Sequence, residues 1–397
     1  MTDELLGSYI RLLLMDLATA PKTSSFATLP APQQADGMVA LSPAKARSLS
    51  IRAGWSALAA DAAEPNAFFE PWFVLPSVQA FAPRTGLSVM AYFEDGDLAG
   101  LMPLAASRDY YGYALPHRVT WLHENAFCGA PLIAKGCEDA FWRALLAHLD
   151  RAPGAALLAH FPALPEGGPA HAALLRVCEQ EGRAQAIVQA RTRAMLASRL
   201  APQDYANAAL SKKHRKELAR QMRRLGDEGA ATFERSTGTQ DLGEWAQDYL
   251  ALEAAGWKGK AGSALGSNAA SARFFEQVIE GAGRAGRLER LTLRLEGSPI
   301  AMLATFLAQP GAFAFKTAYD EGLARYSPGL QLQLQYLDTL SRGDTEWTDS
   351  CASEGHPMIE RLWQERRTLV SCNVALGGRL RRGLLRPLIA YETRERS

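Results

Sequence analysis

The stretch FAFKTAYDEGLARYSPGL, from Phe313 to Leu330, decides the fold that this sequence predicts. It begins within an apolar, aromatic-rich run from Ala312 to Ala318, which is typical of a buried strand. A polar turn follows, and Ser327 then opens a series of leucines at helical spacing. A strand, a loop and a helix therefore meet at one point of the chain.

The start of this predicted helix is a candidate anion site. Ser327 suits the N-cap and Pro328 suits the first helical position, so the first free backbone N–H groups point into the preceding loop. The helix dipole adds partial positive charge there, which favours a phosphate or pyrophosphate. The same pattern is also found where a buried strand runs into a capped helix for structural reasons alone.

A second motif lies upstream. The residues from Glu253 to Gly259 end in Gly-Trp-Lys-Gly, and a loop rich in glycine, serine and alanine continues to Ser267. Such a loop lets the backbone approach a ligand closely, or it is simply a flexible connection. The residues alone leave both interpretations open.

Apolar periodicity predicts alternating helices and strands over most of the chain, and hence a fold of the α/β (α+β) class. In the first half we expect helices at 43–60, 139–149 and 170–181, and strands at 87–93, 98–104, 118–122 and 155–161. In the second half we expect helices at 211–224, 241–254 and 269–282, and strands at 231–233, 288–295, 299–306 and 312–318. Residues 1–44 are expected to form an N-terminal helix and a linker.

The composition favours a globular chain with more than one core. The chain has 397 residues, of which 48% are hydrophobic and 21% are charged, and its formal net charge is +1. This length suits two or three domains. The charge balance gives no whole-chain argument for nucleic acid or membrane surfaces, and we expect no DNA partner.

The cysteines and the N-terminus suggest no special compartment. The cysteines are Cys128, Cys137, Cys178, Cys351 and Cys372. Their odd number and wide spacing predict reduced thiols and no metal site. Arg11 and Asp16 interrupt the apolar run near the start, so we expect no signal peptide, no transmembrane segment and a cytoplasmic location.

A strongly basic helix is expected at 211–224, where Ser211 is a suitable N-cap. Lysine and arginine dominate this stretch, SKKHRKELARQMRR. It is either a solvated helix face or a basic rim for an anionic partner, such as the nucleotide end of coenzyme A, an acidic saccharide or RNA. The sequence does not distinguish these partners.

The motifs around residues 253–330 resemble, in their order, the acyltransferase domain of the GNAT superfamily. The branch is the one called BioF2-like or CelD/BcsL-like, which is associated with cellulose biosynthesis and related to the Fem-type aminoacyltransferases. The resemblance covers residues 205–370 well and the preceding part more loosely. It implies two tandem GNAT-like subdomains, at 45–190 and 191–376, each with a mixed central sheet flanked by helices. A basic C-terminal helix or tail is expected at 377–397.

The resemblance also implies acyl-CoA, for example acetyl-CoA, as a co-substrate and no metal. Its pyrophosphate is expected at Tyr326, Ser327, Pro328, Gly329 and Leu330, with an oxyanion donor among the backbone amides near Thr317, Ala318 and Tyr319. Trp257, Lys258 and Glu321 are expected to bind the substrates.

Candidates for proton transfer or acceptor binding are Asp349, His356, Glu253 and Tyr319, and Lys316 is expected to reach the cleft because the family pattern has a lysine there. Each has a structural alternative. Asp349 is equally suited to cap a strand end, Glu253 to end a helix and Tyr319 to pack a core. Lys316 is otherwise expected to extend to the edge of its strand.

Three hypotheses about function follow. The first is direct transfer of an acyl group from acyl-CoA to an amine or hydroxyl of a small metabolite or of an envelope or exopolysaccharide intermediate. The second is Fem-type transfer from aminoacyl-tRNA, and the third is a non-catalytic accessory role in exopolysaccharide production. The signatures of serine hydrolases, P-loop nucleotidases and zinc proteases are missing from the sequence.

Overall fold

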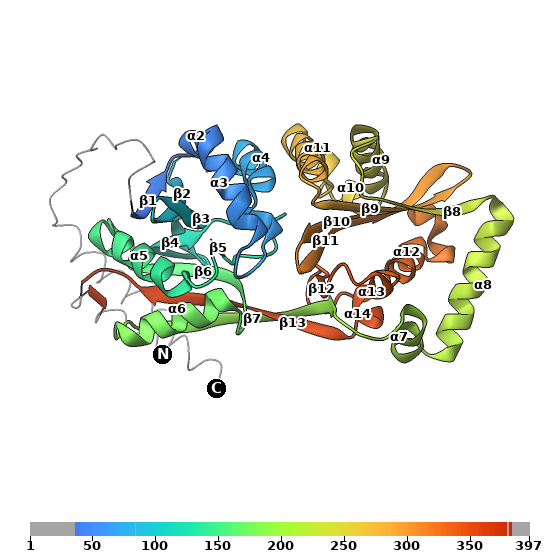
Figure 1. Cartoon of the computed structure of the whole chain (residues 1–397). Coiled ribbons are helices and arrows are strands. Elements are labelled where there is room, and N and C mark those ends of the chain that lie inside the picture. The colour runs from blue at the N-terminus through green and yellow to red at the C-terminus, as the bar shows by residue number, and fades with distance from the viewer. Residues whose placement is uncertain (1–35, 84, 379–380, 383–397) are drawn as a thin grey trace. The chain divides into compact units, whose positions relative to one another are not determined.

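The computed structural model describes residues 36–83, 85–378 and 381–382 (Figure 1). It has the predicted α/β class, with a mixed sheet flanked by helices. The described chain forms two compact units: unit 1 takes the described residues up to 69, those of 83–190 and those from 369 onward, and unit 2 takes residues 70–82 and 191–368. The predicted N-terminal helix and most of the predicted basic tail lie outside the described residues.

Unit 1 is built on strands in the order β1-β2-β3-β4-β6-β13. These strands are β1 (Gly37–Leu41), β2 (Leu87–Glu94), β3 (Asp97–Tyr110), β4 (Tyr113–Thr120), β6 (Leu158–Pro165) and β13 (Glu365–Ala375), and the short β5 (Leu132–Ile133) pairs with β3. Only β4 and β6 are parallel neighbours; the other pairs are antiparallel. The β2–β3 hairpin confirms the strands expected at 87–93 and 98–104, and β1 lies in the stretch that was expected to be a linker.

The helices of unit 1 are amphipathic segments that pack on this sheet. They are α2 (Pro43–Ala46), α3 (Leu49–Ala60), α5 (Glu138–Arg151) and α6 (Pro169–Gln180), with a 3-10 turn at Ala67–Phe69. Trp55 and Trp142 are fully buried, and their indole N–H groups donate to the carbonyls of Phe69 at 2.7 Å and Ala170 at 2.8 Å. The buried indole N–H groups of both tryptophans therefore have hydrogen-bond acceptors.

Unit 2 is built on strands in the order β7-β12-β11-β10-β9-β8. The strands are β7 (Gln185–Leu196), β8 (Ala231–Ser236), β9 (Leu288–Leu295), β10 (Ser298–Ala308), β11 (Gly311–Tyr319) and β12 (Trp347–Asp349). The chain enters the unit within β7, at Arg191, and the run β8 to β11 is an antiparallel sheet. Nearly every residue in the middle of β9, β10 and β11 is buried, as continuous apolar runs predict for strands covered on both faces.

Helices cover both faces of the unit 2 sheet. In Figure 1, α9 and α11 lie on one face, and α12 and α13 lie on the other. The helices of this unit are α4 (Pro71–Phe81), α7 (Pro202–Ala209), α8 (Lys212–Glu228), α9 (Leu242–Ala255), α10 (Trp257–Lys260), α11 (Ala269–Arg284), α12 (Pro328–Tyr336), α13 (Thr339–Arg342) and α14 (Ile359–Leu362), with 3-10 turns at Leu265–Ser267 and Glu321–Tyr326. Ser211 caps α8 as predicted, because its hydroxyl accepts from the N–H of His214 at 3.2 Å.

Helix α4 precedes most of unit 1 in the sequence but belongs to unit 2. Phe73 of α4 makes edge-to-face contacts with Phe274 of α11 at 5.5 Å and with Phe315 of β11 at 6.0 Å. Phe81 contacts Phe274 at 4.9 Å. An aromatic core therefore fixes α4 and α11 on the strand that leads into the candidate site. The domain limits expected from the sequence stay a prediction.

The substitution Phe274→Ala should destabilise unit 2, because Phe274 is buried between α4 and α11. Removing a buried phenylalanine ring costs about 3–5 kcal/mol through lost burial and the cavity left behind. Urea unfolding followed by far-UV circular dichroism measures the loss. Leu200→Ala is the control, because Leu200 is 47% exposed; equal midpoints for the two variants would contradict the packing described.

Candidate active site

Strand β11 separates from its parallel neighbour β12 after the first third of its length. The two strands pair only at Gly311–Trp347, Ala312–Thr348 and Phe313–Asp349. Strand β11 then continues to Tyr319, paired with β10 alone among the described strands. From residue 314 onward, one edge of β11 therefore has backbone groups that no described strand uses.

A bulge lies in β11 at the start of this free edge. Lys316 lies opposite Ala304, whereas Ala314 lies opposite Thr305, so Phe315 is the extra residue. Such a bulge bends the strand and increases its twist. The ammonium group of Lys316 lies 5.7 Å from the centroid of the Phe315 ring. Lys316 is not among the residues that line the hollow described below.

Helix α12 begins shortly after β11 ends. Pro328 occupies its first turn as predicted, but Ser327 has a left-handed backbone, with φ of 53°, and its side chain makes no capping hydrogen bond. Ser327 is therefore the N-cap residue as predicted, although its side chain does not cap the helix. The first helical hydrogen bond is donated by Gln331 to the Ser327 carbonyl at 3.0 Å. The amides of Gly329 and Leu330 precede it and belong to the free N–H groups of the helix terminus.

Gly329 is required by the approach of α12 to β11. A Cβ atom at this position would lie 2.9 Å from the Tyr319 ring and 3.2 Å from the Met358 sulfur. Tyr326 is held from the other side, because its hydroxyl donates to Glu228 at the end of α8, and Arg325 pairs with the same carboxylate at 2.9 Å. The predicted cradle is therefore a fixed turn. Leu330 packs into the core below it.

Seven of the predicted site residues line one small hollow, which we call the β11 hollow. They are Glu253, Trp257, Lys258, Thr317, Ala318, Tyr319 and Glu321. Leu252 and Gly256 complete the lining, and the volume is about 30 Å³. That is room for about one water molecule. The end of α9, the short α10 and the free end of β11 therefore meet here.

Two carboxylates hold α10 against this hollow. Glu253 is buried and accepts from the Lys258 ammonium at 2.7 Å and from the Leu265 N–H at 2.8 Å. Glu321 accepts from the Trp257 N–H at 2.6 Å. Two glycines allow this close packing, since a Cβ at Gly259 would lie 1.8 Å from the Ala254 carbonyl oxygen and one at Gly256 would lie 3.0 Å from Glu321 Oε1. The Trp257 ring remains 58% exposed.

Sequence reasoning missed Tyr249, which lies one turn before Glu253 on α9. Its hydroxyl is buried and has no hydrogen-bond partner among the described residues. Burial raises the pKa of Tyr249 well above its ordinary value, and the charge of Glu253 raises it further. In the sequence, only the spacing of four residues between Tyr249 and Glu253 indicates that their side chains lie on one face of the helix.

His356 lies on the loop before α14 and within electrostatic range of the hollow. Burial lowers the pKa of His356 below its ordinary value of 6.5, and the positive charge of Lys258 lowers it further, against a backbone hydrogen bond and Glu360. Its ring nitrogen Nδ1 accepts only a long contact, 3.4 Å, from the Ile359 N–H. Burial and the charge of Lys258 therefore favour the neutral form of the imidazole.

Asp349 ends β12, but it is fully buried and its carboxylate is saturated. Arg193 donates to Oδ2 at 2.6 Å, Arg367 donates to the same oxygen at 3.1 Å, and the Cys351 N–H donates to Oδ1 at 2.9 Å. A proton acceptor needs an accessible oxygen within reach of the substrate. The proton-acceptor role expected of Asp349 is therefore not supported, and its geometry is that of a structural residue.

None of the helices in the described part of the chain combines the length and the apolarity that a membrane span requires. In the same part of the chain, no three histidine, cysteine or carboxylate side chains gather closely enough to hold a metal ion.

Comparison with known proteins adds a family match and a shared fold. Residues 212–353 match a family model described as an acetyltransferase (GNAT) domain. The structure resembles the crystal structure of FemX, with a TM-score of 0.54 and 10% identity over 85% of this chain and 98% of that one. No curated protein matches the chain.

Two other solved structures share this fold. One is the C-terminal domain of a putative lysylphosphatidylglycerol synthetase from Agrobacterium fabrum, with a TM-score of 0.51 and 12% identity over 86% of this chain and 95% of that one. The other is a protein of unknown function from Bacteroides thetaiotaomicron, with a TM-score of 0.53 and 10% identity over 83% of this chain and 97% of that one. Residues 212–353 are therefore similar to a GNAT domain, and the solved structures share the fold of the chain. The acyltransferase activity and the BioF2-like branch stay predictions.

The substitution Asp349→Ala should lower the free energy of unfolding by about 3–5 kcal/mol, because it leaves the buried guanidinium of Arg193 and the half-buried one of Arg367 without their carboxylate. Urea unfolding measures this loss. Asp227→Ala is the matched control, since Asp227 is an exposed carboxylate on α8 and its removal should change stability by no more than about 0.5 kcal/mol. A change below 1 kcal/mol for Asp349→Ala would contradict the structural role.

Proposed function

We propose that the chain is an acyltransferase that moves an acyl group from acyl-coenzyme A directly to an amine or hydroxyl. The acceptor would be a small metabolite or an envelope or exopolysaccharide intermediate. The observation that carries the proposal is the β11 hollow, where seven residues expected at the site gather beside the free edge of β11 and the start of α12. The family match over residues 212–353 supports it.

The donor would bind along β11 and α12. The free amides of Gly329 and Leu330 and the dipole of α12 suit the pyrophosphate of coenzyme A. The thioester would then lie against the free edge of β11, where backbone N–H groups between Thr317 and Tyr319 suit the oxygen that becomes negative during transfer. No side chain needs to form a covalent acyl intermediate in this arrangement.

The acceptor would enter beside α10. Trp257 is exposed, and the ion pair of Glu253 with Lys258 places both charges at the hollow. Because the hollow holds only about 30 Å³, α10 must shift when substrates enter. The glycines at 256 and 259, on either side of Trp257 and Lys258, are the natural points for such a movement.

The proton would pass to His356 in our proposal. The acceptor nitrogen or oxygen attacks the thioester carbon, the C–S bond breaks, and the coenzyme leaves as a thiolate. The neutral imidazole of His356 accepts the proton that the attacking atom loses, which requires the long contact to Ile359 to open. Glu253 is less suited, because Lys258 and the Leu265 amide occupy both of its oxygens.

The donor is tested by calorimetric titration with acetyl-CoA and with desulfo-CoA. We expect both to bind, because the nucleotide and pyrophosphate make the main contacts. Gly329→Ala should weaken the binding of acetyl-CoA and of desulfo-CoA at least about tenfold. The added Cβ would lie 2.9 Å from the Tyr319 ring and would therefore displace α12 from β11. Gly243→Ala is the matched control, because a Cβ there meets nothing within 4 Å.

A specific observation favours aminoacyl-tRNA as the second candidate donor. Lys212, Lys213, Lys216 and Arg224 are exposed on α8, and no ion pair engages them among the described residues. If charged tRNA binds where neither coenzyme does, and its affinity falls steeply with salt, the Fem-type hypothesis replaces ours. If none of these ligands binds, the non-catalytic accessory role is favoured.

The role of His356 predicts the pH dependence of transfer. Because the pKa of His356 is lowered from 6.5, its basic form persists to lower pH, and the acidic limb of kcat/KM should fall below pH 6.5. His356→Gln should remove this limb and lower kcat about 10²–10⁴-fold, the usual contribution of a general base. An unchanged pH profile in the variant would exclude His356.

A further inference from the structure

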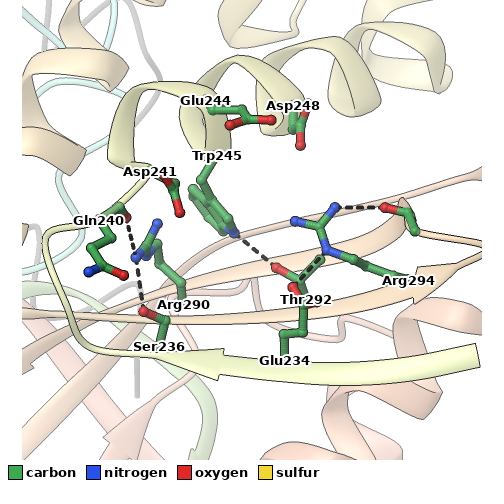
Figure 2. Close-up of a pocket in the computed structure, with 11 residues that line it drawn as sticks. Glu234, Ser236, Gln240, Asp241, Glu244, Trp245, Asp248, Arg290, Thr292 and Arg294 are labelled. Atoms are coloured by element: carbon green, nitrogen blue, oxygen red, sulfur yellow. Dashed lines mark hydrogen bonds and ion pairs between the residues drawn. The ribbon is translucent and has the colours of Figure 1, made fainter.

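A second, larger hollow lies at the opposite end of α9, and we call it the Arg290 hollow. It has a volume of about 440 Å³ and lies between the first turns of α9 and strands β8 and β9 (Figure 2). Its charged residues are Glu234, Asp241, Glu244, Asp248, Arg290 and Arg294. Glu244 and Glu253 are nine residues apart on α9, which is about 14 Å along a helix. The hollow is therefore separate from the proposed transfer site.

Arg290 is a buried cation at the floor of this hollow. It is only 5% exposed, and its Nη2 donates to the Ser236 hydroxyl at 2.9 Å and to the carbonyls of Gly238 at 3.1 Å and Gln240 at 2.9 Å. These acceptors are all neutral. Its Nε has no partner, and no carboxylate forms an ion pair with it among the described residues.

A buried charge without a counter-ion is costly. Burial lowers the pKa of Arg290, and only the more distant charge of Asp241 opposes this shift. An anionic group placed against the guanidinium would therefore complete the site. A carboxylate suits this place, because it forms charge-assisted hydrogen bonds with a guanidinium and also supplies the missing counter-charge.

The rim of the same hollow is acidic. Asp241, Glu244 and Asp248 share one face of α9, and Figure 2 shows Glu244 and Asp248 on the helix above the indole of Trp245. No described cation forms an ion pair with any of the three. Glu234, in contrast, accepts from Arg294 at 2.7 Å. Four carboxylates face two guanidiniums in this lining, so its net charge is −2.

We infer that the Arg290 hollow binds a small basic amino acid, with its carboxylate on Arg290 and its ammonium groups on the carboxylates of α9. A simple anion would meet the acidic rim, and a simple amine would leave Arg290 without a counter-ion. A ligand with one carboxylate and two ammonium groups pairs with Arg290 and with the acidic rim at the same time. Its net positive charge also opposes the net negative charge of the lining. The volume of about 440 Å³ admits such a molecule.

The probe is L-lysine, titrated into the full chain by calorimetry. Cadaverine lacks its carboxylate and L-norleucine lacks its side-chain ammonium, and each should bind at least about tenfold more weakly. Arg290→Gln should weaken L-lysine at least about tenfold and remove its advantage over cadaverine. No binding of L-lysine at millimolar concentration, or equal binding of L-lysine and cadaverine, would overturn the inference.

The rim provides a second variant, because Arg290→Gln changes a buried residue and risks unfolding. The double substitution Glu244→Gln with Asp248→Asn should weaken L-lysine at least about tenfold and leave thermal stability unchanged. Glu276→Gln is the matched control, since Glu276 is an exposed carboxylate on α11 outside the hollow. Unchanged affinity in the double variant would overturn the inference. These titrations do not depend on acyl-CoA, so the two proposals fail separately.

Discussion

The carboxylate of Asp349 is the constraint on which the geometry of unit 2 depends. Two arginines hold it in the core, and its Oδ1 also accepts from the Cys351 N–H, two residues later. Cys351 has a left-handed backbone, with φ of 53°, so the chain turns directly after β12. Strand β12 therefore ends at Asp349, and β11 must continue without its parallel neighbour. A buried ion cluster thus creates the free strand edge.

The unpaired edge of β11 is held in a defined position because other elements pack around it. The aromatic residues of α4 and α11 hold β11 from one face, and Gly329 lets α12 approach Tyr319 from the other. Glu321 holds the start of α10 through the Trp257 amide. Strand β11 and helix α12 are therefore fixed by packing, whereas α10 is held by the contacts of Glu321 and Glu253.

Much of this was predictable from the sequence, because the apolar runs are long and their turns contain glycine and proline. The strands and helices from α8 to α12 lie where periodicity placed them, and the motif from Glu253 to Lys258 does meet the end of β11. The role of Asp349 was not predictable, because its partners Arg193 and Arg367 are distant in sequence and only the fold brings them together. Strand β1 was missed because its pairing with β2, rather than local pattern, defines it.

The carboxylates at the two ends of α9 differ in whether a cation of the chain pairs with them. At the C-terminal end, Glu253 is buried with Lys258, so the charge of each is balanced within the chain. At the N-terminal end, carboxylates are stabilised by the helix dipole and do not need a cation. Arg290 nevertheless stays apart from them, because one nitrogen is bound by the loop of Ser236 to Gln240. The loop thereby keeps the opposite charges of the Arg290 hollow separated, which is the arrangement that a ligand carrying both charges requires.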